Sequence, residues 1–380
     1  MVSGSMVSDK PIFVQILLGT TGGCADQLSP REDYFLHPIT VMKEKGYIPE
    51  VWTLEKGAPG NCRGARIRRF SSALFLVLNL LSNKKVKLIH AHLRPYLPSL
   101  LSGLLNKKCV LTPHTYMLGS SWLIKKFSLM LMKQFDRIIA LTPHERQIYL
   151  DNGITSNKVR LIPHPIDWDF FSKAHLEPTE KIRKRYNIYD NEFVITTVAN
   201  FRRIKNLETM LSAFQKFLYY NKKSKFIVVG KNQLQNKKYS EQGNSRGYAL
   251  GINSIVKQLG DKVIFTGGIG YRQVRKILAI SDIYVNNSDL EAMCLSVYEA
   301  ASAGVPLCLS KIGSFTSVFG DMALYSEPRD EKGLLKNFLK YFENPVLRNK
   351  SGNKLSRFAK KWDYPLVMKD LKVLYKELTD

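Results

Sequence analysis

Residues 282–306 read DIYVNNSDLEAMCLSVYEAASAGVP, and this stretch contains the clearest structural pattern in the chain. Its apolar start is typical of a buried strand, and residues 296–303 predict a short helix, because a glycine and then a proline follow them. Glu291 falls in the loop between the two, and Glu299 is expected in the first helical turn. A helix that begins at the carboxyl end of a parallel strand offers free N–H groups and partial positive charge, which suit a diphosphate. Carboxylates beside it can accept sugar hydroxyls.

A purely structural interpretation of the same residues stays open. Ser296 and Glu299 have the spacing of a capping box, in which the carboxylate bonds back to the N–H group of the residue that caps the helix. Glu291 would then be an ordinary solvated acid of a loop. The pattern by itself does not decide between a ligand site and a helix cap.

The stretch resembles the donor signature of glycosyltransferase family 4, a family of retaining enzymes with the GT-B fold. It shares two glutamates separated by seven residues, a helix of small residues and a following Val-Pro. The resemblance implies that Glu291 contacts the transferred sugar of a nucleoside-diphosphate sugar and that Glu299 holds its ribose. It also implies that Cys294, Leu295 and Ser296 line the donor site. The four residues after the first glutamate are AMCL here instead of the usual GFGL.

Residues 198–214, VANFRRIKNLETMLSAF, resemble the basic loop with which the family grips the donor diphosphate. Lys205 matches the family's lysine. The usual arginine is replaced by Asn200, so Arg202, in preference to Arg203, is expected to supply the second positive charge. Fixed cations would stabilise the negative charge that develops on the departing diphosphate, so we expect no metal ion. The alternative is an ordinary helix with a solvated basic first turn, although positive charge is unfavourable at a helix N-terminus.

Histidines follow two strand-like segments in the first half of the chain. Residues 110–120 resemble the family loop whose histidine reaches the sugar, and that residue is His114 here. Residues 87–105 hold His90 and His92, and we expect His90 to be structural, bonded to a neighbouring carbonyl group. No compact cluster of cysteine, histidine and aspartate accompanies them in the sequence, so a zinc site is not expected.

Near the N-terminus, residues 12–54 predict a strand, a glycine-rich loop, a helix and a second strand. Gly22 and Gly23 permit the backbone to approach a ligand closely, although a plain tight turn has the same pattern. The Lys-Ser/Thr of a P-loop does not follow them. The resemblance implies that this loop lies beneath the donor phosphate and next to the acceptor.

Apolar strands alternate with helix-period segments along the chain, which argues for an α/β fold with two doubly wound parallel sheets. The length of 380 residues suits two domains. The resemblance implies the GT-B architecture, in which two Rossmann-like domains face each other across a cleft. We predict an acceptor-side domain of residues 1–172 with 360–380, whose last helix packs back on it, and a donor-binding domain of residues 180–359. A linker is expected over 170–185, where the periodicity is lost.

Cysteine usage and terminal composition bear on the compartment. The five cysteines are too few and too scattered for a disulfide framework, which favours a reducing, cytoplasmic compartment. The first eleven residues lack the apolar segment of a signal peptide, and the longest apolar run, ALFLVLNLL, is too short for a spanning helix. We therefore expect any membrane contact to be peripheral.

The formal net charge of +25 is unevenly distributed. Residues 56–135 hold fourteen Lys or Arg and no acid, where the overall composition predicts about seven acids. Within them, residues 120–135 predict a helix whose bulky apolar side chains lie beside lysines, as in interfacial helices, although the same stripe could be buried in the first domain. The partner on the acceptor side is expected to be anionic, such as a polyprenyl-phosphate-linked glycan at a membrane surface.

Two other classes of protein share part of these features. A basic nucleic-acid-binding protein would explain the charge, but not paired glutamates beside a helix that suits a diphosphate. The sequence has no helix-turn-helix, zinc-finger or aromatic RNA-binding pattern. Another GT-B enzyme, such as a nucleotide-sugar epimerase or a phosphorylase, would share the fold. We expect a retaining hexosyltransferase, and the family resemblance implies that the donor phosphate itself helps to deprotonate the acceptor.

Overall fold

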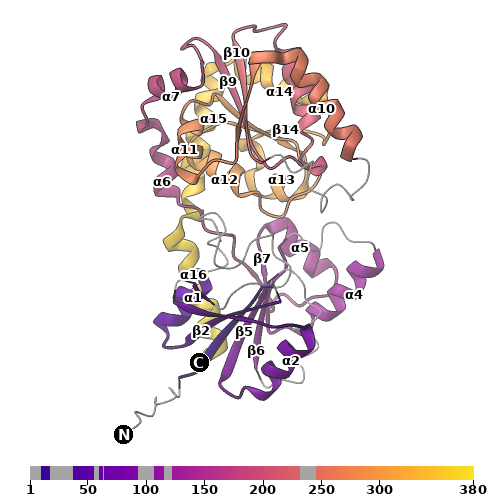
Figure 1. The fold of residues 1–380 in the computed structure, drawn as a ribbon, viewed down its shortest axis with the longest axis vertical. Coiled ribbons are helices and arrows are strands. Elements are labelled where there is room, and N and C mark those ends of the chain that lie inside the picture. The colour runs from indigo at the N-terminus through magenta and orange to yellow at the C-terminus, as the bar shows by residue number, and fades with distance from the viewer. Residues whose placement is uncertain are drawn as a thin grey trace. The chain divides into compact units, whose positions relative to one another are not determined.

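The computed structural model of the protein describes residues 10–17, 37–54, 60–62, 64–92, 107–114, 122–231 and 245–380. The chain divides into two compact units, Met1–Pro165 with Pro365–Asp380, and Ile166–Tyr364. Each unit has helices packed around its own sheet of mainly parallel strands, which confirms the predicted fold class (Figure 1).

The first unit contains an eight-stranded sheet in the order β3-β4-β2-β1-β5-β6-β7-β8. All neighbouring strands are parallel except β3 and β4. The strands are β1 (Ile12–Leu17), β2 (Ile48–Thr53), β3 (Gly60–Cys62), β4 (Ala65–Arg69), β5 (Val86–His92), β6 (Lys108–Thr112), β7 (Arg137–Ala140) and β8 (Val159–Leu161). The order reverses between β1 and β5, which is where ligands bind in sheets of this type.

Helices cover both faces of this sheet (Figure 1). One face carries α2 (Ala73–Ser82), α4 (Trp122–Met132) and α5 (Pro143–Asp151), which share an apolar core with alternate strand residues. The opposite face carries α1 (His37–Glu44) and α16 (Tyr364–Thr379). On that face the rings of Phe13 and Tyr375 meet edge to face, 5.8 Å apart. The last helix of the chain therefore packs against the first sheet.

The second unit contains a six-stranded sheet in the order β11-β10-β9-β12-β13-β14, and every neighbouring pair is parallel. Its strands are β9 (Phe193–Val198), β10 (Ser224–Val229), β11 (Val263–Gly267), β12 (Ile283–Asn286), β13 (Leu307–Ser310) and β14 (Leu324–Ser326). The strand order reverses between β9 and β12, so this sheet also has a switch point.

The helices of the second unit again cover both faces of its sheet (Figure 1). One face buries apolar residues of α8 (Leu207–Phe217), α10 (Ser245–Leu259) and α14 (Glu331–Glu343). The other helices are α6 (Trp168–Ser172), α7 (Thr179–Arg185), α11 (Tyr271–Ala279), α12 (Leu295–Ser302), α13 (Gly313–Phe319) and α15 (Pro345–Ala359). Within the described ranges of the chain, no helix is both long and apolar enough to cross a membrane.

The helix expected over 296–303 is α12, and each of its ends lies one residue before the predicted one. Gly304 has φ +75° and ends the helix, with Gly304 N–H donating to Ala301 O and Val305 N–H donating to Ala300 O. This is the Schellman pattern that a terminal glycine permits. The helix starts at Leu295. Glu299 therefore lies in the second turn, whereas we expected it in the first.

The prediction of a linker over 170–185 is wrong. This segment forms α6, the 3₁₀ turn Lys173–Leu176 and α7. The Arg275 guanidinium bonds to the Glu177 carboxylate and lies 4.1 Å over the Phe170 ring, which fixes the segment to α11. These helices are too short to show a helical period in the sequence. The boundary between units instead follows Pro165, because Ile166 pairs with Asp363 and its N–H donates to Trp362 O.

Candidate functional site

The predicted donor residues of the second unit gather at its switch point, where the loops after β9 and β12 lie side by side. Lys205, from the first loop, forms an ion pair with Glu291, from the second. The side chains are only 11% and 9% exposed. Two residues that the sequence separates widely are thus joined at the carboxyl ends of adjacent strands, where open α/β sheets bind ligands.

Hydrogen bonds from backbone and side-chain groups hold the two loops together. Asn206, with φ +50°, donates from its side-chain amide to Asn287 O (2.8 Å) and to the Asp289 carboxylate (2.6 Å). The N–H of Asp289 donates to Ile204 O at 2.9 Å. The left-handed conformation at Asn206 turns the chain from the basic loop into α8, so Lys205 stands just before that helix.

The ion pair also affects the pKa of Lys205. Burial lowers the pKa of Lys205, but the negative charge of Glu291 and its hydrogen bond outweigh this and raise the pKa above the ordinary value. The Ser288 hydroxyl donates to the same Glu291 oxygen at 2.8 Å. Lys205 is therefore a protonated, positioned cation at neutral pH, and Glu291 is oriented by two donors.

The structure separates the two candidates for the second cation. Arg202 is half-buried and its positive charge acts on Lys205, whereas Arg203 is exposed. Asn200 stands at the position of the usual arginine. Its side-chain oxygen accepts a hydrogen bond from the N–H of Lys231 at 3.0 Å. Arg202 stays the predicted partner of Lys205 in holding phosphate.

Gly230, which sequence reasoning missed, allows this loop to form. Its φ is +155°, and a Cβ atom added there would overlap the carbonyl group of Ala199 and lie 3.1 Å from Asn200 N. The N–H of Phe201 donates to Lys231 O at 3.0 Å, so the chains after β9 and β10 run closely together. The only sequence signal was a glycine directly after an apolar strand, and many plain turns share it.

The capping-box interpretation of α12 is wrong. Cys294 is the N-cap residue, but its side chain accepts no hydrogen bond from the N–H groups of the first turn, and Ser296 lies inside that turn. The Ser296 hydroxyl donates to Val198 O (2.8 Å) and accepts the hydroxyl hydrogen of Tyr284 (2.8 Å), which ties α12 to the end of β9. Glu299 is 2% exposed.

The remaining predicted donor contacts also lie at the start of α12. Leu295 is the first helical residue and is half-buried, next to Cys294. Burial, with a smaller contribution from Glu291, raises the pKa of the Cys294 thiol to about 11, so this thiol is neutral. That Cys294, Leu295, Ser296 and Glu299 bind the donor stays a prediction. Gly22 and Gly23 lie outside the described residues.

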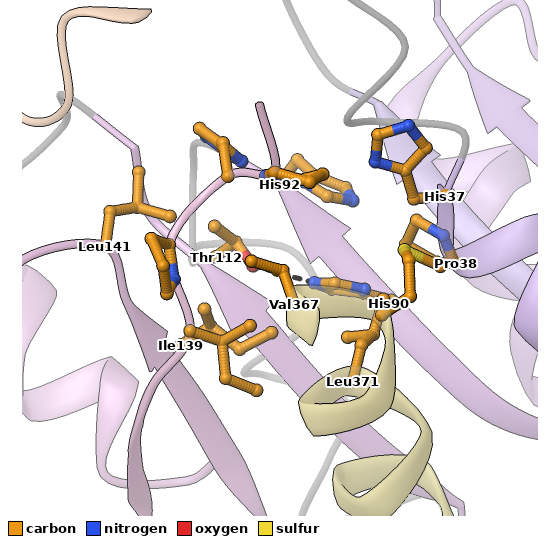
Figure 2. A pocket seen from close by; sticks show the side chains of 14 residues that line it. His37, Pro38, His90, His92, Thr112, Ile139, Leu141, Val367 and Leu371 are labelled. Atoms are coloured by element: carbon orange, nitrogen blue, oxygen red, sulfur yellow. Dashed lines mark hydrogen bonds between the residues drawn. The ribbon is translucent and has the colours of Figure 1, made fainter. Parts of the chain in front are cut away.

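The first unit contains a row of buried histidines at the carboxyl ends of β5 and β6 and beyond β8. The rings stack in sequence: His90 on His92 (4.3 Å), His92 on His114 (5.3 Å) and His114 on His164 (5.1 Å). Figure 2 shows His90, His92 and Thr112 among the side chains that line a small cavity, together with Val367 and Leu371 of α16. His164 was not singled out from the sequence, although it follows a proline shortly after a strand, as His114 does.

We predicted that His90 bonds to a carbonyl group, but its two ring nitrogens bond to hydroxyl groups instead. Its Nδ1 lies 2.6 Å from the Tyr375 hydroxyl of α16 and its Nε2 lies 2.8 Å from the Thr112 hydroxyl. Hydroxyls can donate or accept, so they satisfy a buried imidazole in either tautomer. The role of His90 is structural, as expected, but through side chains.

The other three imidazoles form a directed chain of hydrogen bonds. The Gln15 amide nitrogen, which can only donate, lies 2.8 Å from His92 Nε2. His92 must then carry its proton on Nδ1, which lies 3.0 Å from His114 Nε2. By the same argument His114 donates from Nδ1 to His164 Nε2, 3.2 Å away. Each neutral ring accepts on one side and donates on the other.

Burial keeps this row uncharged. It lowers the pKa of His90 and of His114 to about 3, with further repulsion of His90 by His114. The pKa values of His92 and His164 are also well below the ordinary value, first because of burial and then because of neighbouring histidines. Four rings stacked out of water cannot all accept protons.

His114 itself has φ +54°, a left-handed conformation that only a few per cent of residues other than glycine adopt. Such backbone strain is often kept at functional sites. Both ring nitrogens of His114 bond within the row, so contact with a sugar, which stays a prediction, would require it to exchange one of these bonds. Within the described ranges, no group of three or more His, Cys, Asp or Glu side chains is arranged to hold a metal ion.

Comparison with known proteins gives matches along most of the chain. The family model described as Glycosyltransferase Family 4 matches residues 31–170, and that described as Glycosyl transferases group 1 matches residues 178–362. An Escherichia coli UDP-Gal:alpha-D-GlcNAc-diphosphoundecaprenol alpha-1,3-galactosyltransferase is 25% identical over 75% of this chain and 74% of its own length.

Two further comparisons show how far the likeness extends. N-acetyl-alpha-D-glucosaminyl L-malate synthase from Bacillus anthracis is 25% identical over 46% of this chain. That match spans only 42% of the Bacillus protein's length. Among solved structures, Anabaena HepE in complex with UDP and glucose has a TM-score of 0.76 over 97% of this chain and all of its own, at 14% identity. This last likeness shows the fold alone.

Proposed function

The chain belongs to the group 1/family 4 glycosyltransferases, whose GT-B fold it shares, and from this premise we propose that it transfers a hexose from a nucleoside-diphosphate sugar to a glycan or lipid-linked acceptor. The donor would bind in the second unit and the acceptor on the first. Transfer would retain the anomeric configuration, with the departing phosphate taking the acceptor's proton.

The observation that carries this proposal is the buried ion pair of Lys205 and Glu291 at the switch point of the second sheet. A cation held there lies near Cys294 at the start of α12, where a diphosphate would bind, and a carboxylate beside it could accept hydrogen bonds from sugar hydroxyls. Negative charge grows on the diphosphate as the sugar bond breaks, so a fixed lysine stabilises the transition state more than the ground state. With Arg202 as a second cation, the proposal requires no metal ion.

The comparisons support a nucleotide-sugar donor. The E. coli relative is named for UDP-Gal and for a diphosphoundecaprenol acceptor, and the Anabaena structure holds UDP and glucose. No observation on the described residues favours an epimerase over a transferase. A uridine donor is therefore the first to test, with guanine nucleotides as the comparison.

We further propose that the acceptor is anionic and is met at an anionic membrane surface. The support is the excess of basic residues over 56–135, which contain no acid. Each basic side chain near such a surface contributes about 1 kcal/mol, so a few of them give reversible attachment.

The test is a panel of UDP- and GDP-sugars against the full chain. Thermal stabilisation identifies the donor, because a ligand at 100 times its dissociation constant adds roughly 2.7 kcal/mol. Release of nucleoside diphosphate should then require an added acceptor, such as a prenyl-diphosphate-linked sugar. No stabilisation by any member of the panel, or equal release without acceptor, would overturn sugar transfer by this site.

A further inference from the structure

Two helices on the same face of the first sheet have apolar side chains on the side that points away from the sheet. In α2, Leu76 and Leu80 are buried in the core, yet three leucines at helical spacing on the opposite side are 44–64% exposed: Leu74, Leu78 and Leu81. In α4, Leu129 and Met132 are buried, and a second stripe with the same spacing is 50–69% exposed: Leu123, Phe127 and Met130. Phe75 and Trp122 widen the two stripes, at 55% and 69% exposed.

Such exposure is unusual for surface helices. A helix of a water-soluble domain normally has one apolar stripe and a charged opposite face, whereas a helix that is apolar all round belongs in an apolar environment. Eight large apolar side chains on two helices of one layer exceed the scattered exposure found on ordinary surfaces. The outer faces of α2 and α4 therefore fit a partner that is itself apolar.

The charged residues of the run 56–135, which includes both helices, are all positive. Neither helix contains an acid, and the whole run 56–135 contains none. Lys126 lies over the Trp122 ring at 5.2 Å, so a cation stands within the exposed apolar stripe of α4. Exposed lysines also follow each helix: Lys84, Lys87 and Lys133.

Not every basic residue of the run takes part. The Arg68 guanidinium donates to Asn79 at 3.0 Å and lies 4.8 Å over the Trp52 ring, so it belongs to the packing of the fold. The Lys107 ammonium donates to Asn83 O at 2.9 Å and closes the end of α2. The lysines beside the apolar stripes are positive charges available to a partner.

We propose that the outer faces of α2 and α4 form a docking surface for an anionic phospholipid bilayer. The helices have ten and eleven residues, where crossing a bilayer takes about twenty, so they would lie along the surface with their outer side chains among the lipid headgroups. The lysines would pair with lipid phosphates. A second copy of this chain fits less well, because a symmetric contact would place lysine against lysine.

This inference does not depend on sugar transfer, and it differs from attraction by charge alone. Charge alone predicts that replacing lysines abolishes binding, whereas insertion predicts that the apolar stripes are required as well. Binding to vesicles and stabilisation by a nucleotide sugar can be measured separately. The failure of one proposal is therefore distinguishable from the failure of the other.

The test compares full chains in sedimentation with phosphatidylcholine vesicles that do or do not contain phosphatidylglycerol. The docking variant carries four polar substitutions on the outer faces: Leu74→Gln, Leu78→Gln, Leu123→Gln and Met130→Gln. The control variant replaces four exposed apolar residues of the second unit: Tyr219→Gln, Tyr220→Gln, Leu250→Gln and Val346→Gln. Wild type and control should bind only the anionic vesicles, and the docking variant should lose at least tenfold in affinity.

A spectroscopic arm keeps the wild-type surface intact. Because Trp122 is 69% exposed, brominated lipid in anionic vesicles should quench its fluorescence, and this quenched component should disappear in Trp122→Phe. Equal vesicle binding by the docking variant and wild type, or unquenched Trp122 in bound protein, would overturn the proposal. So would loss of a dimer in the docking variant without any vesicle binding by wild type, since the surface would then join two copies.

Discussion

The side-chain amide of Gln15 lies 2.8 Å from His92 Nε2, and this one contact determines which nitrogen of three imidazoles carries the proton. An amide N–H can only donate, so His92 accepts on Nε2 and donates from Nδ1, and His114 does the same toward His164. Gln15 is on β1 and His92 is on β5, the two strands between which the order of the first sheet reverses. The row thus begins at the switch point of that unit.

The first prediction concerns this tautomer. Nitrogen NMR should show His92 and His114 protonated on Nδ1 in the wild type. A carboxylate can only accept, so Gln15→Glu should reverse the chain and place the proton of both rings on Nε2. His144, on α5 and outside the row, should be unchanged and serves as control. Protons on Nε2 of the wild-type rings would refute the assigned direction.

The second prediction is a loss of stability in acid. An unfolded histidine takes up a proton below about pH 6.5, whereas burial holds His90 and His114 neutral down to a pKa of about 3. Between these values the unfolded state binds more protons, so stability falls as the pH falls, by about 1.4 kcal/mol per pH unit for each such histidine. Urea unfolding at about pH 7 and about pH 5 measures the slope.

The buried Glu145 acts in the opposite direction. Burial raises the pKa of Glu145 to about 7, so its contribution falls as the pH rises from its ordinary value toward 7. This effect of Glu145 cancels the pH dependence of stability that one histidine of the row contributes, but not that of all four. His164→Asn should therefore flatten the acid side of the profile. A wild-type free energy of unfolding that is constant between about pH 7 and pH 5 would contradict a neutral row.

Much of the second unit was predictable from the sequence because its signals are local. The strand Ile283–Asn286, the helix after it and the stop at Gly304 all follow from residues a few positions apart. The exact start of α12 was not predictable, because the Ser296 hydroxyl donates to Val198 O, a group nearly a hundred residues away. Local patterns do not contain that bond, so the helix was expected to start one residue too late, with Glu299 in its first turn instead of its second.

The contacts between distant segments could not be derived. Lys205 and Glu291 were each singled out, but their ion pair depends on β9 and β12 being neighbours, which only the strand order determines. The histidine row likewise depends on the adjacency of β1, β5 and β6. The outer stripe of α2 was missed for another reason: an apolar run reads the same whether one side of the helix or both sides are buried.

The third prediction tests the close approach at Gly230. A Cβ atom there would overlap the Ala199 carbonyl group, so Gly230→Ala must displace the loop that carries Arg202 and Lys205. We expect a loss of stability of about 3 kcal/mol or more, and weaker nucleotide binding. Gly267→Ala is the matched control, since Gly267 also has positive φ but open space, and it should cost only about 1–2 kcal/mol. Equal melting temperatures of the two variants would argue against the clash.

The fourth prediction concerns Glu299, which is buried and does not cap its helix. Gln has nearly the same shape but is uncharged, so Glu299→Gln should keep the melting temperature while donor affinity falls at least about tenfold, or roughly 1.4 kcal/mol. Calorimetric titration with the donor gives the affinity, and Glu343→Gln, at the exposed end of α14, is the control. Unchanged affinity would leave Glu299 with a structural role.

The last prediction places the Lys205 charge on the donor diphosphate. Lys205→Ala should lower turnover by on the order of a hundredfold or more, because the lost charge acts most strongly on the departing group. Removing one member of a buried ion pair also leaves the other uncompensated, so stability should fall as well. The double variant Lys205→Ala with Glu291→Gln should recover stability but not turnover, which separates the two effects.

Two measurements then identify what Lys205 binds. Lys205→Ala should weaken the binding of a nucleoside diphosphate more than that of the corresponding monophosphate. Lys276 is an exposed lysine of α11, and Lys276→Ala should leave both affinities unchanged. Equal weakening of the binding of both nucleotides would show that Lys205 does not contact the second phosphate. Wild-type activity should also survive EDTA, because the cations are side chains. Activity that EDTA removes and magnesium or manganese restores would show that a metal ion, and not Lys205 with Arg202, neutralises the leaving group.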